Sequence, residues 1–123
     1  MKPKFVDHIV IIVKDVKRTA DFYSSFLGEP IQMDKEQVAF QIGKTKLFFG
    51  LPYGEYEKYD KDKYGLNHLA FGVGSLNELK KFKGILDKNG IKNSGIKTDK
   101  YGKKEFIWFD DCDGIRLEFY LRT

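Results

Sequence analysis

The chain has 123 residues, of which 41% are hydrophobic, 15% aromatic and 33% charged; this describes one folded domain and excludes a disordered segment. The net charge is +4, but the 22 basic residues are interspersed with 18 acidic ones, as in the stretch 57–63. Mixed charges are typical of a solvated surface and argue against a continuous basic stripe, so we expect no nucleic-acid partner.

The first half of the chain predicts a strand, a helix and three further strands. Residues 6–13 form a β-branched run, which we interpret as a strand because no small-residue cleavage site of a secretion signal follows it. Asp15 is placed to cap a helix that ends at Gly28, ahead of Pro30. Residues 31–33, 37–42 and 45–51 predict three strands, the last two joined by a two-residue turn.

The second half begins with a connection, residues 52–65, that is rich in Tyr, Lys and Asp and long enough to be functional. Residues 66–73 predict a strand. Ser75 and Glu78 form a capping box at the start of a helix that ends before Gly90. The predicted apolar face of this helix consists of Leu76, Leu79, Phe82 and Leu86. Residues 105–109 and 115–121 predict two more strands.

The two halves repeat each other at a spacing of 60 residues, which joins His8 to His68 and the helix caps Asp15 to Ser75. The sequence therefore predicts an α+β fold in which one domain contains two β-α-β-β-β modules, about 4–51 and 66–121. The helix of each module covers one face of its sheet. The two bare faces can then curve into a cup.

The chemistry-bearing residues follow from strand alternation. His68 shares its predicted strand face with the small residues Ala70 and Gly72, which leaves room beside the ring. In the last strand Glu118 lies opposite the apolar face, on the side that also carries Arg116, Tyr120 and Arg122. If the modules pair, His8, His68 and Glu118 can converge in the cup.

Two imidazoles and one carboxylate with open positions suit a divalent ion such as Mn, Fe, Co, Ni or Zn. The alternative is that both histidines are structural and that Glu118 pairs with a neighbouring arginine. Because the only two histidines hold equivalent positions in the repeat, we favour the metal site.

The candidate substrate-binding residues on the same side of the sheet are Arg116, Tyr120 and Arg122. Trp108 is a fourth candidate. Arginine can hold a carboxylate, phosphonate or enolate with two parallel hydrogen bonds, which predicts a small, oxygen-rich, anionic substrate. The alternative for the arginines is a solvent-exposed strand end or ion pairs with nearby acids. Trp108 lies on a strand that lines or backs the cup, and we favour core packing for its ring.

Three stretches resemble the vicinal oxygen chelate superfamily, which includes glyoxalase I, fosfomycin- and bleomycin-resistance proteins, methylmalonyl-CoA epimerase and extradiol dioxygenases. They are Asp-His-Ile-Val at 7–10, Asn-His-Leu-Ala-Phe at 67–71 and Asp-Cys-Asp-Gly at 111–114 ahead of Glu118. With the first helix they span nearly the whole chain. The resemblance implies the two-module cup and places the metal ligands of the family on His8, His68 and Glu118.

The sequence departs from parts of this superfamily. Glyoxalase I and the epimerase have a fourth ligand where the alignment of 47–49 with 117–119 puts Phe48, and a phenyl ring cannot coordinate an ion. Three-ligand members, the fosfomycin-resistance proteins and the dioxygenases, are therefore more similar. Cys112 replaces a proline in the turn at 111–114, and the potassium-binding loop of the thiol-transferring members has no counterpart.

The resemblance implies a metal-dependent enzyme that stabilises an oxyanion on its substrate, with Glu105 as a candidate general base. One alternative is an Fe(II) oxygenase of the extradiol dioxygenase type. Another is a binding protein of the bleomycin-resistance type without a metal, against which the presence of all three ligand residues argues.

Partners and location follow from the same observations. We expect a small-molecule substrate, no membrane partner, and a homodimer, because of the repeat, the resemblance and the prevalence of two-fold symmetry. The lone cysteine, Cys112, excludes an internal disulfide and suggests a cytoplasmic protein. The connection contains Tyr53, Tyr56, Tyr59 and Tyr64. These side chains form either a lid over the cup or a cluster on the surface.

Overall fold

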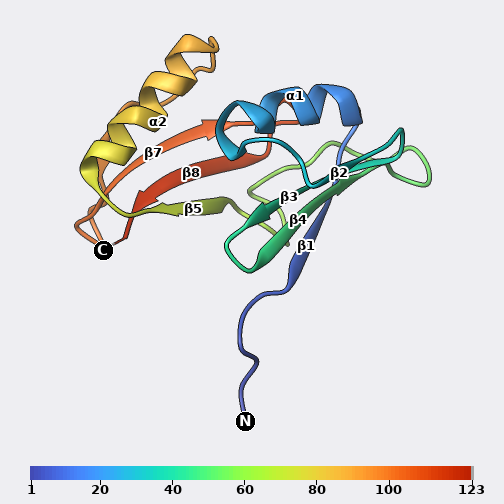
Figure 1. Cartoon of the computed structure of the whole chain (residues 1–123), viewed down its shortest axis with the longest axis horizontal. Helices are drawn as coiled ribbons and strands as arrows, with labels where there is room; N and C mark the ends of the chain where they lie inside the picture. The colour runs from blue at the N-terminus through green and yellow to red at the C-terminus, as the bar shows by residue number, and fades with distance from the viewer. Residues whose placement is uncertain (123) are drawn as a thin grey trace. The chain divides into compact units, whose positions relative to one another are not determined.

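The computed structural model describes residues 1–122, which form two compact units, Met1–Glu57 and the part that begins at Lys58. Each unit has a four-stranded sheet and one helix in the order β-α-β-β-β (Figure 1). This confirms the predicted α+β fold of two equivalent modules. No helix within residues 1–122 is long and apolar enough to cross a membrane.

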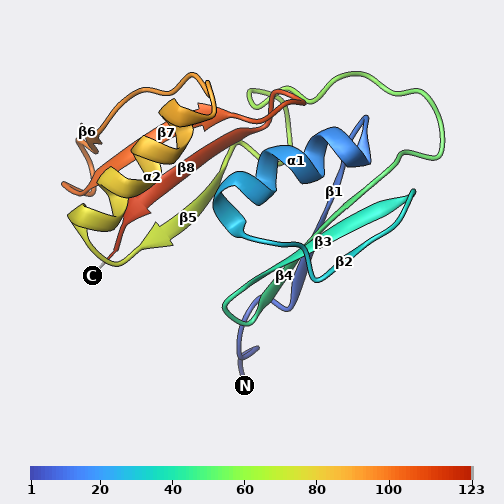
Figure 2. The ribbon, with the colours of Figure 1, turned by 45° about the horizontal axis from the view of Figure 1, so that its top comes forward.

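The first unit places its helix on one face of its sheet (Figure 2). Its elements are β1 (His8–Ile12), α1 (Val16–Leu27), β2 (Gln32–Met33), β3 (Gln37–Ile42) and β4 (Thr45–Gly50). The strands lie in the order β1-β4-β3-β2, and β1 runs parallel to β4. Asp15 Oδ1 accepts from the backbone N–H of Arg18 at 3.0 Å, which confirms the predicted cap of α1.

The second unit repeats this arrangement. Its elements are β5 (Leu69–Val73), α2 (Leu76–Lys88), β6 (Lys97–Thr98), β7 (Glu105–Asp110) and β8 (Arg116–Leu121). The strands lie in the order β5-β8-β7-β6, and α2 packs on β5, β7 and β8. Ser75 Oγ caps the N–H of Glu78 at 3.1 Å, while Glu78 Oε2 accepts from Gly74, one residue earlier than in a standard capping box.

Each unit has an aromatic core between its helix and its sheet. In the first unit Tyr23, Phe40 and Phe49 are fully buried, and the ring centroids of Tyr23 and Phe49 lie 4.3 Å apart. In the second, Phe119 is buried and stacks on Phe82 of α2 at 4.4 Å. Aromatic pairs at these separations contribute stability beyond the area that they bury.

One residue predicted for the core of the second unit lies outside it. Leu76 is 40% exposed, whereas Leu79 and Leu86 of the same helix are fully buried. Leu76 is the first residue of α2, and the start of the helix does not bring that side chain onto the buried face. The apolar face of α2 therefore begins one turn later than the sequence pattern predicts.

The register of the two sheets shows how far the modules correspond. Ala70 of β5 lies opposite Glu118 of β8, and Val10 of β1 lies opposite Phe48 of β4. Because His68 and His8 each stand two residues before these pairs, Phe48 occupies in the first unit the place that Glu118 occupies in the second. This confirms the predicted alignment of Phe48 with Glu118.

Candidate functional site

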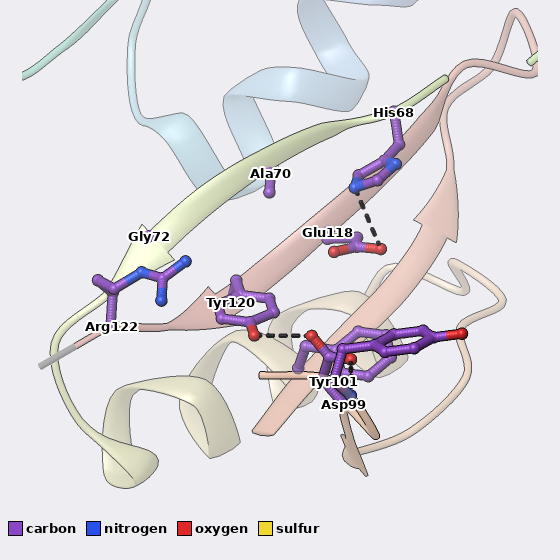
Figure 3. Close-up of a pocket in the computed structure, with 9 residues that line it drawn as sticks. His68, Ala70, Gly72, Asp99, Tyr101, Glu118, Tyr120 and Arg122 are labelled. Atoms are coloured by element: carbon purple, nitrogen blue, oxygen red, sulfur yellow. Dashed lines mark hydrogen bonds and ion pairs between the residues drawn. The ribbon is translucent and has the colours of Figure 1, made fainter. Parts of the chain in front are cut away.

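The second unit carries a pocket of about 570 Å³ on the face of its sheet opposite α2 (Figure 3). The residues that line it are His68, Ala70, Gly72, Asp99, Tyr101, Phe106, Glu118, Tyr120 and Arg122. The apolar residues of β8 point to the other face and are buried, as strand alternation requires. The predicted polar face of β8 therefore contributes Glu118 and Tyr120 to an open pocket, and Arg122, which directly follows the strand, contributes a third side chain.

His68 and Glu118 face each other at one end of this pocket (Figure 3). His68 Nε2 lies 3.7 Å from Glu118 Oε2, which is longer than a hydrogen bond. The imidazole is 41% exposed and the carboxylate 16% exposed. Ala70 and Gly72 add almost no side-chain volume on β5, so the space beside the ring stays open, as the sequence predicts.

The other nitrogen of His68 is held by the preceding residue. His68 Nδ1 lies 2.7 Å from Asn67 Oδ1, and Asn67 Nδ2 donates to the backbone carbonyl of Lys61 at 2.9 Å. Because the amide nitrogen is engaged with a carbonyl, the amide oxygen must face the ring and accept the Nδ1 proton. A neutral His68 then presents the lone pair of Nε2 toward Glu118.

His8 has an equivalent arrangement within the first unit. His8 Nδ1 lies 2.9 Å from Asp7 Oδ2, so the carboxylate of the preceding residue takes the place that the Asn67 amide has beside His68. The ring of His8 contacts the edge of Phe48, with centroids 5.8 Å apart. The first unit therefore offers one histidine donor and no acid at the position that corresponds to Glu118.

The spacing of the facing pair in the second unit can be compared with the spacing that a shared divalent ion requires. Two ligand atoms that each lie about 2.1 Å from one ion, at tetrahedral or octahedral angles, stand about 3.0–3.4 Å apart. The 3.7 Å separation of His68 Nε2 and Glu118 Oε2 is close to that range. Within residues 1–122 no group of three or more His, Cys, Asp or Glu side chains is placed to hold an ion. The structure thus brings two of the three predicted ligand residues together.

The opposite end of the pocket carries a hydrogen-bonded tyrosine. The Tyr120 hydroxyl donates to Asp99 Oδ2 at 2.8 Å, and Asp99 Oδ1 accepts from the backbone N–H of Tyr101 at 3.0 Å. The bond to Asp99 raises the pKa of Tyr120 above its ordinary value. The backbone N–H of Tyr101 and the Tyr120 hydroxyl together lower the pKa of Asp99.

The two arginines predicted as substrate contacts have different environments. The Arg122 guanidinium lies over the Tyr120 ring at 4.7 Å and lines the pocket. Arg116 donates from Nε to Asp110 Oδ1 at 2.7 Å and lies over the Trp108 ring at 4.1 Å, outside the pocket lining. For Arg116 the alternative of an ion pair with a nearby acid is therefore the arrangement observed.

Trp108 and Glu105 also lie differently from their predicted roles. Trp108 is half-buried and pairs with Glu118 across the sheet, whereas the core positions of β7 belong to Ile107 and Phe109. The favoured core-packing role of Trp108 is therefore wrong. Glu105 shares the strand parity of Ile107 and is absent from the pocket lining, so the pocket gains no general base from it.

Three residues of the pocket were not identified from the sequence. Asp99 and Tyr101 belong to the β6–β7 connection, whose fold brings them against β8. No sequence pattern relates them to Tyr120, which stands about twenty positions later. Phe106 lies two residues from Trp108 on the same strand face, but the run 106–109 is apolar throughout, so the sequence does not say which face that is.

Gly102 lets the β6–β7 connection approach Tyr120 closely. A Cβ atom at residue 102 would overlap the Tyr120 hydroxyl and lie 3.0 Å from Asp99 Oδ2. We expect Gly102→Ala to break the bond between Tyr120 and Asp99, so the pKa of Tyr120 should fall back toward its ordinary value of about 10. The measurement is a titration of the tyrosine side chains by 13C NMR.

The matched control for this variant is Gly84→Ala, since a Cβ there meets no atom within 4 Å. It should leave the Tyr120 titration as it is in the unmodified protein. An unchanged titration in Gly102→Ala would contradict the close approach.

The family model of the Glyoxalase/Bleomycin resistance protein/Dioxygenase superfamily matches residues 5–119. With two β-α-β-β-β modules and a pocket on the bare face of the second sheet, the chain belongs to this superfamily. The resemblance expected from the three sequence stretches is therefore confirmed.

Three known proteins are similar to the chain over most of its length. It is 32% identical over 128 residues to the uncharacterized protein YwkD of Bacillus subtilis, covering 95% of this chain and 96% of YwkD. It is 25% identical over 118 residues to the metallothiol transferase FosB of Staphylococcus haemolyticus, covering 95% and 83%. The solved structure of SMU.1112c aligns with a TM-score of 0.78 and 27% identity, over 97% and 99% of the two chains.

Proposed function

We propose that this chain is a divalent-metal-dependent enzyme of the glyoxalase and fosfomycin-resistance type, acting on a small oxygen-rich substrate. The observation that carries the proposal is the facing pair of His68 Nε2 and Glu118 Oε2, 3.7 Å apart in an open pocket. His8 is the proposed third ligand, because it has the equivalent position and an equivalent Nδ1 partner in the first unit. Mn, Fe, Co, Ni and Zn all accept this donor set.

An ion bound there supplies a Lewis acid that stabilises negative charge developing on a substrate oxygen. The protein's own residues select and orient the substrate. Arg122 offers a planar, permanently charged donor group at the other end of the pocket, suited to a carboxylate or phosphonate. The Tyr120 hydroxyl donates a hydrogen bond to Asp99, so its oxygen is left to accept a hydrogen bond from a substrate.

Two neighbouring functions are the alternatives. An Fe(II) oxygenase would use the same donors, and a binding protein of the bleomycin-resistance type would use the pocket without an ion. The donor pair supports a metal-dependent function over the second. The similarity to a protein named metallothiol transferase supports group transfer as one reaction within the proposed class. The homodimer and the cytoplasmic location stay predictions, as does the lid formed by the tyrosines of the connection.

The test begins with metal binding by the full chain. After treatment with a chelator, anaerobic titration with Mn²⁺, Fe²⁺, Ni²⁺, Co²⁺ and Zn²⁺ in a calorimeter should give one ion bound per chain. The loaded protein is then assayed with fosfomycin, with and without thiols, with methylglyoxal hemithioacetals and with catechols. We expect turnover that depends on the ion and stops when chelator is added.

The outcomes separate the candidate functions. Oxygen consumption with catechols would replace the proposed reaction class by the oxygenase. Failure to bind any of the five ions would refute the metal-dependent function and leave the binding protein. Ion binding without turnover on this panel would exclude these substrates and refute their assignment to the pocket.

A further inference from the structure

The connection that leads to His68 is held by side-chain hydrogen bonds and not by regular secondary structure. Residues 51–68 contain no strand or helix, and almost all of them are exposed. Tyr59 and Lys61 are the two half-buried exceptions. Both make contacts to the residues that directly precede His68, so this part of the connection is packed against the start of β5 and has a defined conformation.

Tyr59 holds the backbone of that segment. Its hydroxyl donates to the carbonyls of Leu66 and Asn67, the latter at 2.8 Å. A phenol has one proton, so the two carbonyls share a single donor and must converge on it. Tyrosine is protonated at neutral pH, and burial raises the pKa of Tyr59 further, so the hydroxyl stays a donor in mildly alkaline solution as well.

Lys61 holds the side chain of Asn67 through its backbone. The carbonyl of Lys61 accepts from Asn67 Nδ2 at 2.9 Å. A turn fixes the direction of that carbonyl, because Asp60 Oδ1 accepts from the N–H of Asp62 at 2.9 Å and Asp60 O accepts from Lys63 N at 3.2 Å. The amide plane of Asn67 is thereby anchored at its nitrogen, and its oxygen lies 2.7 Å from His68 Nδ1.

We propose that Tyr59, the Lys61 carbonyl and Asn67 form a positioning relay that sets the rotation and the tautomer of His68. Asn67 Oδ1 accepts only when the proton is on Nδ1, and the lone pair of Nε2 then faces Glu118. The nitrogen that carries the proton in a neutral imidazole is decided by the partner of the other nitrogen. The inference rests on the proposed function in one respect only: the role of the relay is to present His68 Nε2 as a metal ligand.

The relay has an internal contrast in the same chain. His8 Nδ1 is held by the carboxylate of Asp7. A carboxylate has two oxygens that can both accept and no N–H group of its own, so it accepts in either orientation. The Asn67 amide accepts with one atom only and so needs an anchor for its nitrogen. The connection supplies that anchor through Lys61 in the second unit.

The test reads the tautomer directly in the metal-free protein. Long-range ¹H–¹⁵N spectra at about pH 9, where imidazoles are neutral, distinguish a protonated ring nitrogen from an unprotonated one. The chain has two histidines, so His8 serves as the internal reference. We expect His68 in the unmodified protein to carry its proton on Nδ1. A proton on Nε2 would overturn the relay.

Three variants divide the relay into its parts. Asn67→Ala should remove the Nδ1–H preference, whereas Asn67→Asp keeps an acceptor and should retain it. Tyr59→Phe should weaken the preference in the same direction as Asn67→Ala. Tyr53→Phe removes a hydroxyl from a fully exposed tyrosine of the same connection and should leave the His68 signals unchanged. If His68 keeps its tautomer in Asn67→Ala, the relay is refuted. If His68 keeps its tautomer in Tyr59→Phe, Tyr59 is not part of the relay.

Metal affinity gives an independent second readout. Loss of an outer partner of a metal-binding histidine costs about 10–100-fold in affinity, so Asn67→Ala should bind Zn²⁺ more weakly by that factor. Asn67→Asp should recover most of the loss. If the unmodified protein binds no ion, the proposed function fails while the tautomer result still decides the relay. Equal affinity in Asn67→Ala and the unmodified protein would contradict the relay alone.

Discussion

Glu118→Ala is expected to weaken divalent-ion binding by more than about a hundredfold, because a ligand should matter at least as much as an outer partner, whose loss costs about 10–100-fold. The carboxylate lies 3.7 Å from His68 Nε2. The other carboxylate that lines the pocket, Asp99, is bonded to the Tyr120 hydroxyl and the Tyr101 N–H, and Arg122 is a cation, so neither is placed to replace it. Turnover that depends on the ion should disappear with the binding.

The fold should survive this change. Glu118 is on the pocket face of β8, and the buried core residues Leu117 and Phe119 on either side are untouched. The free energy of unfolding should therefore change by no more than about 1 kcal/mol. Calorimetric titration with Mn²⁺ and Zn²⁺ measures the affinity, and thermal unfolding measures the stability.

Asp21→Ala is the matched control, since it removes an exposed acid that pairs with Lys17 on α1. It should bind ions as the unmodified protein does. Unchanged ion affinity in Glu118→Ala would show that the carboxylate is not a ligand and would remove the main support of the proposed function.

Phe119→Ala is expected to lower the free energy of unfolding by about 3–5 kcal/mol. The Phe119 ring is 1% exposed and stacks on Phe82 at 4.4 Å and Phe109 at 5.2 Å, so its removal leaves a cavity between α2 and the sheet. Urea unfolding followed by the fluorescence of Trp108, the only tryptophan, reports on the second unit. Phe119→Leu, with a smaller loss of volume, keeps the measurement possible if the alanine variant does not fold.

Leu76→Ala is the control for this series. Leu76 is 40% exposed at the first position of α2, so its truncation should cost less than about 1 kcal/mol. A loss as large as that of Phe119→Ala would mean that the apolar face of α2 includes Leu76 after all, as its spacing in the sequence predicts.

Much of the fold follows from the sequence because its signals are local. The caps at Asp15 and Ser75 and the alternation of β8 depend on neighbouring residues, and the structure confirms all three. The β-α-β-β-β repeat requires a strand at the place of β6, but its residues are not located by the sequence, because Lys97 and Thr98 have no apolar pattern. They are held in the sheet by pairing with Phe106 and Glu105, and this pairing cannot be predicted from the residues around them.

The face of Trp108 shows a different limit. The run Phe-Ile-Trp-Phe at 106–109 is apolar at every position, so alternation alone does not say which half of it is buried. The register with β8 decides the matter, because it sets Ile107 opposite Phe119 and Trp108 opposite Glu118. A sequence pattern predicts a face only where polar and apolar residues alternate, as they do in β8.

The site shows where local reasoning ends. His68 and Glu118 were predicted from alternation in two strands, and the pairing of β5 with β8 brings them together. Asn67 was not predicted as a partner of His68, nor Asp99 as a partner of Tyr120. Both depend on side-chain hydrogen bonds made by connections, the Asn67 amide through the carbonyl of Lys61 and Asp99 through the turn at Tyr101.

The strict alternation of β8 has a consequence for how the protein can change. Within this six-residue strand the odd-numbered residues are buried, and the even-numbered residues Glu118 and Tyr120 line the pocket. Substitution at 118 or 120 can therefore alter ligand selection while the hydrophobic contacts stay intact. Insertion or deletion of a single residue would instead exchange the two sets at once and destroy folding and recognition together. New specificities at this strand are therefore reached by replacement of side chains and never by a change in its length.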